Sequence, residues 1–151
     1  MIAFCFYIPR RYQCGKQIRL ERWELAAKSF EVDLLIAIDR TGFECLSIEQ
    51  PAGEPSVIVV RHITEVYEAY PNASRVFVEK DAPSGVIPTD LYEYQHPAGD
   101  VVYFIGDDGS GFVGDTSDGD WVVVPTLSKY GLWAEQAGLI VMADRCRRDD
   151  N

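Results

Sequence analysis

A glycine- and aspartate-rich stretch in the C-terminal half of the chain has the residue types of a ligand-binding loop. This stretch, Gly106–Gly111 (GDDGSG), lies between the apolar runs Val101–Ile105 and Trp121–Val124. Apolar runs bounded by turn residues are typical of strands buried on both faces of a sheet, and ligands bind at the carboxyl ends of such strands. Because glycine permits close approach, the backbone of this loop could contact a small molecule. The alternative is a surface turn, which favours the same residue types.

Other chemistries fit the residues less well. Gly106–Gly111 contains neither the G-x-G-x-x-G of a dinucleotide loop nor the G-K-[ST] of a P-loop, and the nearby aspartates lack the spacing of a calcium loop. Two histidines, and four cysteines without a C-x-x-C pair, do not predict a metal centre or a disulfide scaffold. No apolar stretch approaches the roughly 20 residues of a membrane span. We therefore expect a cytoplasmic protein without metal or membrane contacts.

Strands and helices alternate along the chain in the predicted secondary structure. Short runs of branched and aromatic residues predict strands, and apolar residues at helical spacing predict helices. This order is typical of an α/β fold, so we expect a single domain over residues 1–151 with a mostly parallel sheet flanked by helices. The predicted strands are 2–8, 32–38, 57–60, 76–78, 101–105 and 121–124, the helices are 18–30, 63–70 and 132–145, and a helical turn capped by Thr89 is expected at 89–94.

The charge of the chain is strongly negative but uneven. A net charge of −10 argues against a protein that binds nucleic acid through electrostatics alone. Residues 1–30, however, carry six Lys/Arg against two Glu, which is +4, and so the remainder carries −14. A second basic group consists of Arg145, Arg147 and Arg148. Ordinary solvated surface and a local basic patch on an acidic body are both compatible with this pattern.

Three separate stretches match the motifs of one protein family in order and spacing. The first, Gln13–Arg19 (QCGKQIR), follows the first predicted strand, and the second runs from His96-Pro97 through an apolar strand to Gly106–Gly111. The third is the apolar strand ending at Pro125 with the apolar helix Leu132–Arg145. Together they resemble the Asn-x-Gly-Asn-x-x-Arg, His-Pro to Gly-x-Glu-x-x-Gly, and strand–helix motifs of the SpoU-type (TrmH-like) RNA 2′-O-ribose methyltransferases of the SPOUT superfamily. The resemblance covers nearly the whole chain.

The resemblance implies a fold and an activity. The fold would be an α/β knot, in which the C-terminal part of the chain forms a deep trefoil knot. The protein would be a homodimer, with S-adenosylmethionine held by loop backbone in the knot. The reaction would be methyl transfer to a ribose 2′-OH of tRNA or rRNA. A sulfonium cofactor carries an activated methyl group, so neither a metal nor a protein nucleophile is needed.

The resemblance also implies roles for particular residues. Arg19 matches the active-site arginine of the family. Its reference pKa above 12 makes arginine a poor base, so it would hold a phosphate or stabilise negative charge; the alternative is a surface arginine at a helix start. The RNA-binding residues would be Arg10, Arg11, Lys16 and Arg22, on a basic face that Arg147 and Arg148 of either subunit could extend. The cofactor-binding residues would be Glu79, Ile105, Gly106, Asp108, Gly111, Val124, Pro125 and Leu132.

Several residues depart from the family pattern. Gln13 and Lys16 replace two asparagines, and Asp108 replaces a glutamate. Trp133 and Glu135 stand where the family has Asn and Ser. Trp133 is interpreted as a core aromatic, with stacking on a base as the alternative.

Three further residues are interpreted as structural. We expect His62 to have a structural role, His96 to be a turn residue before Pro97, and Cys5 to lie in the core. With the departures in the motifs, two further functions stay open. One is a catalytically inactive SPOUT-like module that binds RNA or a protein, and the other is a methyltransferase for a base or a non-RNA acceptor.

Overall fold

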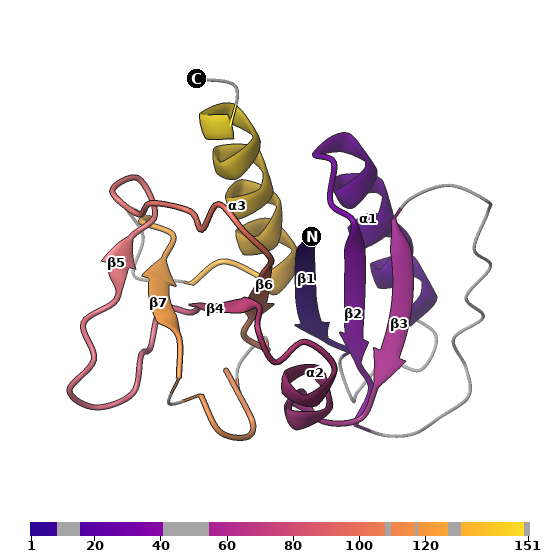
Figure 1. Cartoon of the computed structure of the whole chain (residues 1–151), viewed down its shortest axis with the longest axis horizontal. Helices are drawn as coiled ribbons and strands as arrows, with labels where there is room; N and C mark the ends of the chain where they lie inside the picture. The colour runs from indigo at the N-terminus through magenta and orange to yellow at the C-terminus, as the bar shows by residue number, and fades with distance from the viewer. Residues whose placement is uncertain (9–15, 41–54, 108–109, 117, 127–130, 150–151) are drawn as a thin grey trace.

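The structure is a computed structural model of the chain, and it describes residues 1–8, 16–40, 55–107, 110–116, 118–126 and 131–149 (Figure 1). The side chains of residues 16–19 and 149 are outside the description. In the described residues, seven strands form one sheet in the order β3-β2-β1-β6-β4-β7-β5. All neighbouring strands are parallel. The strands are β1 (Ile2–Tyr7), β2 (Leu34–Ile38), β3 (Ser56–Val60), β4 (Ser74–Val78), β5 (Thr89–Asp90), β6 (Val101–Ile105) and β7 (Asp120–Val123).

Helices cover both faces of this sheet. Helices α1 (Lys16–Ser29) and α3 (Ala134–Asp149) pack on one face, and the short α2 (Ile63–Ala69) packs on the other. Alternate residues of β1 enter the two cores, because side chains alternate between the faces of a strand. Phe4 and Phe6 face α1 and α3, whereas Cys5 is buried on the α2 face, as predicted. The predicted parallel α/β architecture is therefore confirmed.

Helices α1 and α3 contact each other through a glycine. The indole of Trp23 in α1 stacks on Phe6, with ring centroids 4.4 Å apart and an interplanar angle of 7°. Gly138 of α3 lies directly against the same indole, so that a Cβ at this position would collide with the ring. Because the side chain is absent, α3 can approach α1 closely over the sheet. Trp23 is thus held between a strand and a helix backbone.

The predicted helical turn at 89–94 begins later than expected. Thr89 and Asp90 form β5, which pairs with β7, so the prediction that Thr89 caps a helical turn was wrong. The turn follows at once, with the Tyr94 amide donating to the Asp90 carbonyl at 3.0 Å. The Asp90 carboxylate accepts from the Tyr92 amide at 2.8 Å and caps this turn instead. The two-residue strand was missed because a single pair of polar residues carries no periodicity.

His96 belongs to a buried polar network and is not merely a turn residue. Its imidazole is 4% exposed and lies between Tyr103 on β6 and Asp144 on α3. Arg145 Nη1 donates to the Tyr103 hydroxyl at 3.0 Å, which leaves the tyrosine proton for His96 Nδ1 at 2.7 Å. The Nε2–H of His96 then donates to Asp144 Oδ2 at 3.1 Å. The network fastens α3 to the sheet and to the segment before β6.

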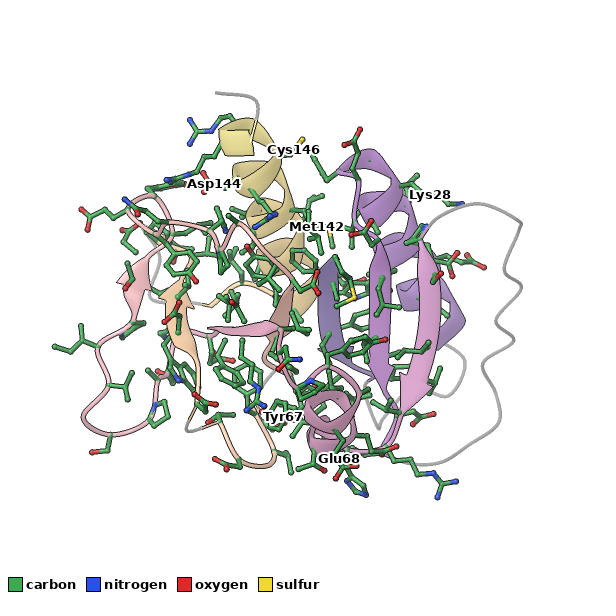
Figure 2. All side chains as sticks on the ribbon, viewed as in Figure 1. Lys28, Tyr67, Glu68, Met142, Asp144 and Cys146 are labelled. Atoms are coloured by element: carbon green, nitrogen blue, oxygen red, sulfur yellow. The ribbon has the colours of Figure 1, made fainter. Side chains whose placement is uncertain are left out.

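The second basic group of the sequence forms part of the same network. Arg145 is 6% exposed and also donates to the Pro97 carbonyl. Arg147 and Arg148 both pair with Asp144, at 3.0 Å and 2.8 Å. Figure 2 shows Asp144 on α3, near the end of the helix. Two of the three arginines therefore pair with one buried carboxylate, and the third binds a carbonyl and a tyrosine hydroxyl.

The network makes stability sensitive to acid. Burial lowers the pKa of the His96 imidazole below its ordinary value of 6.5, although the hydrogen bond to Asp144 acts in the opposite direction. Below pH 6.5 the imidazole of His96 is therefore protonated to a greater extent in the unfolded chain than in the folded chain. The free energy of unfolding consequently falls as the pH drops from 7 to 5. Urea unfolding at these pH values measures the effect. We expect His96→Gln to flatten this dependence.

The exposed His62 provides the matched control for this measurement. His62 precedes α2, and its amide donates to Glu65 Oε1 at 2.9 Å, which supports the structural role predicted for it. His62→Gln removes the chain's other imidazole and should retain the pH dependence of the native protein. An unchanged slope in His96→Gln would show that another group is responsible.

Candidate functional site

A pocket of about 780 Å³ lies at the carboxyl ends of three neighbouring strands. Its walls include Glu79 after β4, Gly106 after β6 and Val124 after β7. The start of α3 closes one side with Ala134 and Ala137. Parallel sheets bind ligands at this edge, and the volume is in the range of small-molecule sites. Described residues of the candidate ligand loop Gly106–Gly111 contribute to the pocket, and so do residues that follow β7.

The loop after β6 is tightly closed. The Asp107 amide donates to the Gly111 carbonyl at 2.7 Å, and the Gly111 amide donates back to the Asp107 carbonyl at 3.0 Å. Gly111 has φ +63°, a left-handed conformation that favours glycine. Ser110 Oγ donates to the Asp107 carboxylate at 2.8 Å. These bonds give the pocket a backbone wall of defined shape.

An ion pair fastens the same loop to the other half of the sheet. Arg40, which follows β2, pairs with Asp107 at 2.7 Å, and both side chains are only 12% exposed. The guanidinium lies over the ring of Tyr7, 5.0 Å from its centroid. The Tyr7 hydroxyl in turn accepts from the Val113 amide at 3.1 Å. The loop is therefore held from β1 and β2 as well as from β6.

The roles of Arg40 and Asp107 were not evident from the sequence. The available signal was the Asp-Arg pair directly after the apolar run of β2, at the same edge of the sheet as Gly106. A partner 67 residues away in sequence cannot be identified from spacing alone. Since a buried charge needs a partner, the position of Arg40 makes sense only in the folded structure.

The carboxylate of Glu79 lies against the first glycine of the loop. A Cβ at Gly106 would collide with Glu79 Oε2, and a Cβ at Gly111 would come within 3.7 Å of the same oxygen. Glu79 Oε1 accepts from the Lys80 amide at 2.7 Å, which orients the carboxylate. The absence of a side chain at Gly106 therefore makes room for Glu79 itself. This refines the sequence interpretation, in which glycine only permitted approach of a ligand.

The predicted cofactor-binding residues gather at this one pocket, as far as the structure describes them. Asp108 lies outside the described residues, so its position is not part of the site's geometry. The role of all the predicted residues in binding a cofactor stays a prediction. The seven that line the pocket are Glu79, Ile105, Gly106, Gly111, Val124, Pro125 and Leu132.

The predicted catalytic and RNA-binding residues are described less fully. Arg19 lies in the first turn of α1, which follows the carboxyl end of β1, but its side chain is outside the description, as is that of Lys16. Arg10 and Arg11 lie outside the described residues. Arg22 is exposed and approaches Glu135 of α3 at 3.5 Å. Their assignment to catalysis and RNA binding stays a prediction.

Trp133 at the start of α3 is a surface residue. Its side chain is 60% exposed, so the interpretation of a core aromatic was wrong. Its amide donates to the Gln136 side chain at 3.0 Å and caps the helix. Its neighbours Leu132 and Ala134 both line the pocket. The indole is therefore available for contact beside the pocket, as the stacking alternative requires.

The fold is shared with known RNA methyltransferase structures. No protein-family model matches the sequence, and neither does any curated protein. The SpoU methyltransferase AviRb from Streptomyces viridochromogenes, in complex with AdoMet, superposes with a TM-score of 0.74 at 12% identity, over 100% of this chain and 58% of that chain. The A. aeolicus TrmH/SpoU tRNA modifying enzyme gives 0.70 at 12% identity, over 99% and 75%. A structure concerning 2-OH methylation of C/U34 on tRNA gives 0.67 at 16% identity, over 98% and 95%.

These similarities establish the class of fold. The chain has the fold of SpoU/TrmH-type methyltransferases, as its motifs predicted. It spans 59% of a TrmH-family structure from Porphyromonas gingivalis and 58% of AviRb, so those proteins contain further parts. Within the described ranges, no helix has the length and apolar character required to cross a membrane.

Proposed function

We propose that this protein is an S-adenosylmethionine-dependent RNA methyltransferase that methylates a ribose 2′-OH in tRNA or rRNA. The observation that carries the proposal is the pocket at the ends of β4, β6 and β7, where seven residues predicted to bind the cofactor come together. The SpoU and TrmH names of the similar structures support it, as does the AdoMet in the AviRb complex.

The pocket fits a nucleoside cofactor. Apolar side chains of Ile105, Val124 and Leu132 offer surface to an adenine ring, and glycines 106 and 111 offer close backbone contact. Glu79 supplies a negative charge at the same edge. S-adenosylmethionine would bring a methyl group already activated by its sulfonium. The protein then has to bind the cofactor, orient the acceptor hydroxyl and stabilise the charge that develops on it.

Arg19 would act on the acceptor. It lies in the first turn of α1, at the end of the sheet that holds the pocket. As a permanent cation it would hold an RNA phosphate or stabilise negative charge on the attacking ribose oxygen, rather than take the proton itself. Arg10, Arg11, Lys16 and Arg22 would bind the RNA backbone, since all belong to the basic first part of the chain.

We further propose that the chain is one domain that works as a cytoplasmic homodimer with a C-terminal trefoil knot. Support for a partner comes from exposed apolar side chains on adjacent helices. Leu25 of α1 is 68% exposed, Trp133 directly before α3 is 60% exposed, and Leu139 of α3 is 44% exposed. A second copy covering α1 and α3 would bury them. It would also bring two sets of basic residues to one RNA.

Two other functions keep some support. An inactive RNA- or protein-binding module is favoured by Trp133 and Glu135, which stand where the family has Asn and Ser. Glu135 lies near Arg22, which reduces the local positive charge. A base or a non-RNA acceptor is favoured by the net charge of −10.

Calorimetry with S-adenosylmethionine and the full chain separates the enzyme from a binding module. We expect saturable binding, followed by transfer of a labelled methyl group to bulk tRNA or rRNA. Absence of binding at about 1 mM cofactor would overturn the enzyme proposal, because a Kd above about 1 mM corresponds to a binding free energy weaker than about −4 kcal/mol. Nucleoside analysis of the product then distinguishes 2′-O-methylation from methylation of a base.

Arg19→Ala should lower the rate of RNA methylation by about 100-fold, the size expected when a group that stabilises transition-state charge is removed. Affinity for S-adenosylmethionine should stay nearly unchanged, because the role assigned to Arg19 concerns the acceptor. Calorimetry and single-turnover methylation measure the two quantities. Lys28→Ala, at the other end of α1 (Figure 2), is the matched control and should leave both unchanged. Equal losses in affinity and rate for Arg19→Ala would show that the assigned role is wrong.

A further inference from the structure

We propose that the Glu79 carboxylate is the specificity determinant of the pocket, and that it accepts hydrogen bonds from the two ribose hydroxyls of an adenosine ligand. The proposal rests on the function proposed above, and it adds a side-chain role for one residue. Glu79 follows β4, the middle strand of the three that end at the pocket. It is therefore close to both loops that a bound nucleoside would contact.

The geometry prepares the carboxylate for this role. The Lys80 amide donates to Glu79 Oε1 at 2.7 Å, while Oε2 lies against the Cα of Gly106. Gly106 and Gly111 both lack the Cβ that would displace or cover this oxygen. An ionised carboxylate offers about four lone-pair sites on two oxygens, so it can accept two hydroxyl groups and still hold the Lys80 amide.

The chemistry of the ligand matches this acceptor. Vicinal hydroxyls are two donors at fixed spacing, which suits the two oxygens of a carboxylate. Acidic side chains at the same edge of other parallel sheets hold the ribose of nucleotides in this way. Hydrogen bonds to a charged acceptor are stronger than neutral ones. One carboxylate can therefore distinguish a ribonucleoside from its deoxy analogues by more than tenfold.

The test compares adenosine with 2′-deoxyadenosine, 3′-deoxyadenosine and 2′,3′-dideoxyadenosine on the full chain, by calorimetry. For the native protein we expect adenosine to bind at least about tenfold more tightly than the dideoxy analogue. Glu79→Gln keeps the size of the side chain and removes its charge, and should reduce this preference to about threefold or less. Glu79→Ala should abolish it. Glu68→Gln is the matched control, since Glu68 is an exposed acid on α2 that is not among the residues lining the pocket, and it should keep the full preference.

The outcomes separate this inference from the proposed function. If neither S-adenosylmethionine nor adenosine binds the native protein, the proposed function is overturned, and the inference with it. If S-adenosylmethionine binds but the native protein shows no preference for the diol, or Glu79→Gln keeps the native preference unchanged, only the inference is overturned. A different result would be that the variant loses a preference for S-adenosylmethionine over S-adenosylhomocysteine, whose sulfur carries no charge. Glu79 would then recognise the sulfonium, which also overturns the diol assignment. Thermal unfolding of each variant verifies that the fold is intact.

Discussion

Gly138→Val should lower the free energy of unfolding by about 3 kcal/mol, near the upper end of overpacking costs in well-packed cores. The reason is the indole of Trp23, which a Cβ at position 138 would meet at its Cη2 and Cζ3 atoms. The ring cannot retreat, because it is 3% exposed and stacks on Phe6. Urea unfolding monitored by tryptophan fluorescence measures the loss.

The smaller substitution Gly138→Ala has two opposing effects on the free energy of unfolding, one from helix propensity and one from the collision with Trp23. The sign of the measured change shows which effect is larger. Alanine in place of glycine in a helix interior normally stabilises by about 1 kcal/mol. We expect Gly138→Ala to destabilise nevertheless, since the collision with Trp23 involves a buried ring and not a flexible side-chain end. Gly99→Ala is the control, because a Cβ there has no neighbour within 4 Å. A stabilised Gly138→Ala would mean that α1 and α3 do not pack as closely as described.

Asp144→Ala should cost about 3 kcal/mol, the lower end of the range for breaking a buried ion pair by removing one partner. The carboxylate is 5% exposed, accepts hydrogen bonds from His96 and Arg147, and forms an ion pair with Arg148. The lower end of the range is appropriate because Arg147 is 69% exposed and Arg148 is 30% exposed. Water can therefore solvate the two arginines after the carboxylate is removed. Urea unfolding at pH 7 measures the change.

An exposed ion pair supplies the comparison for Asp144. Asp118 is 89% exposed and pairs with Arg75 at 3.5 Å, so Asp118→Ala should cost about 0–1 kcal/mol. Burial acts to raise the pKa of Asp144, but hydrogen bonds from His96 and Arg147 hold it below its ordinary value, so its contribution is present at pH 7 and is lost only in strong acid. If both substitutions cost the same, the network does not fasten α3 to the sheet.

The loop Gly106–Gly111 shows how far local reasoning extends into the site. Glycines directly after an apolar run identified a loop at the carboxyl end of a strand, and in the structure the described residues of this loop line the pocket. The reason for glycine at 106, however, is the carboxylate of Glu79, which arrives from another strand. Asp107 similarly appeared to be one more turn residue, but it pairs with Arg40. Both facts depend on neighbours distant in sequence.

Trp133 and His96 show the opposite errors. Apolar spacing around the start of α3 favoured a buried tryptophan at position 133, yet its side chain is 60% exposed. His96 before a proline suggested a turn, yet its ring is buried against Tyr103 and Asp144. Residue type predicts the average tendency of burial, whereas the packing of one element against another decides the individual case.

Apart from the two-residue strand β5, the sequence by itself determined the order of strands and helices, and it also determined the parallel α/β class and the stretches that form the pocket. It could do so because apolar runs, helical spacing and glycine-rich turns are local signals that each element carries alone. Only the tertiary structure decided the partners, namely Glu79 on Gly106, Arg40 with Asp107, Gly138 against Trp23 and the network around His96. These contacts join residues far apart in sequence, and only packing brings them within the few ångströms at which hydrogen bonds and close contacts form.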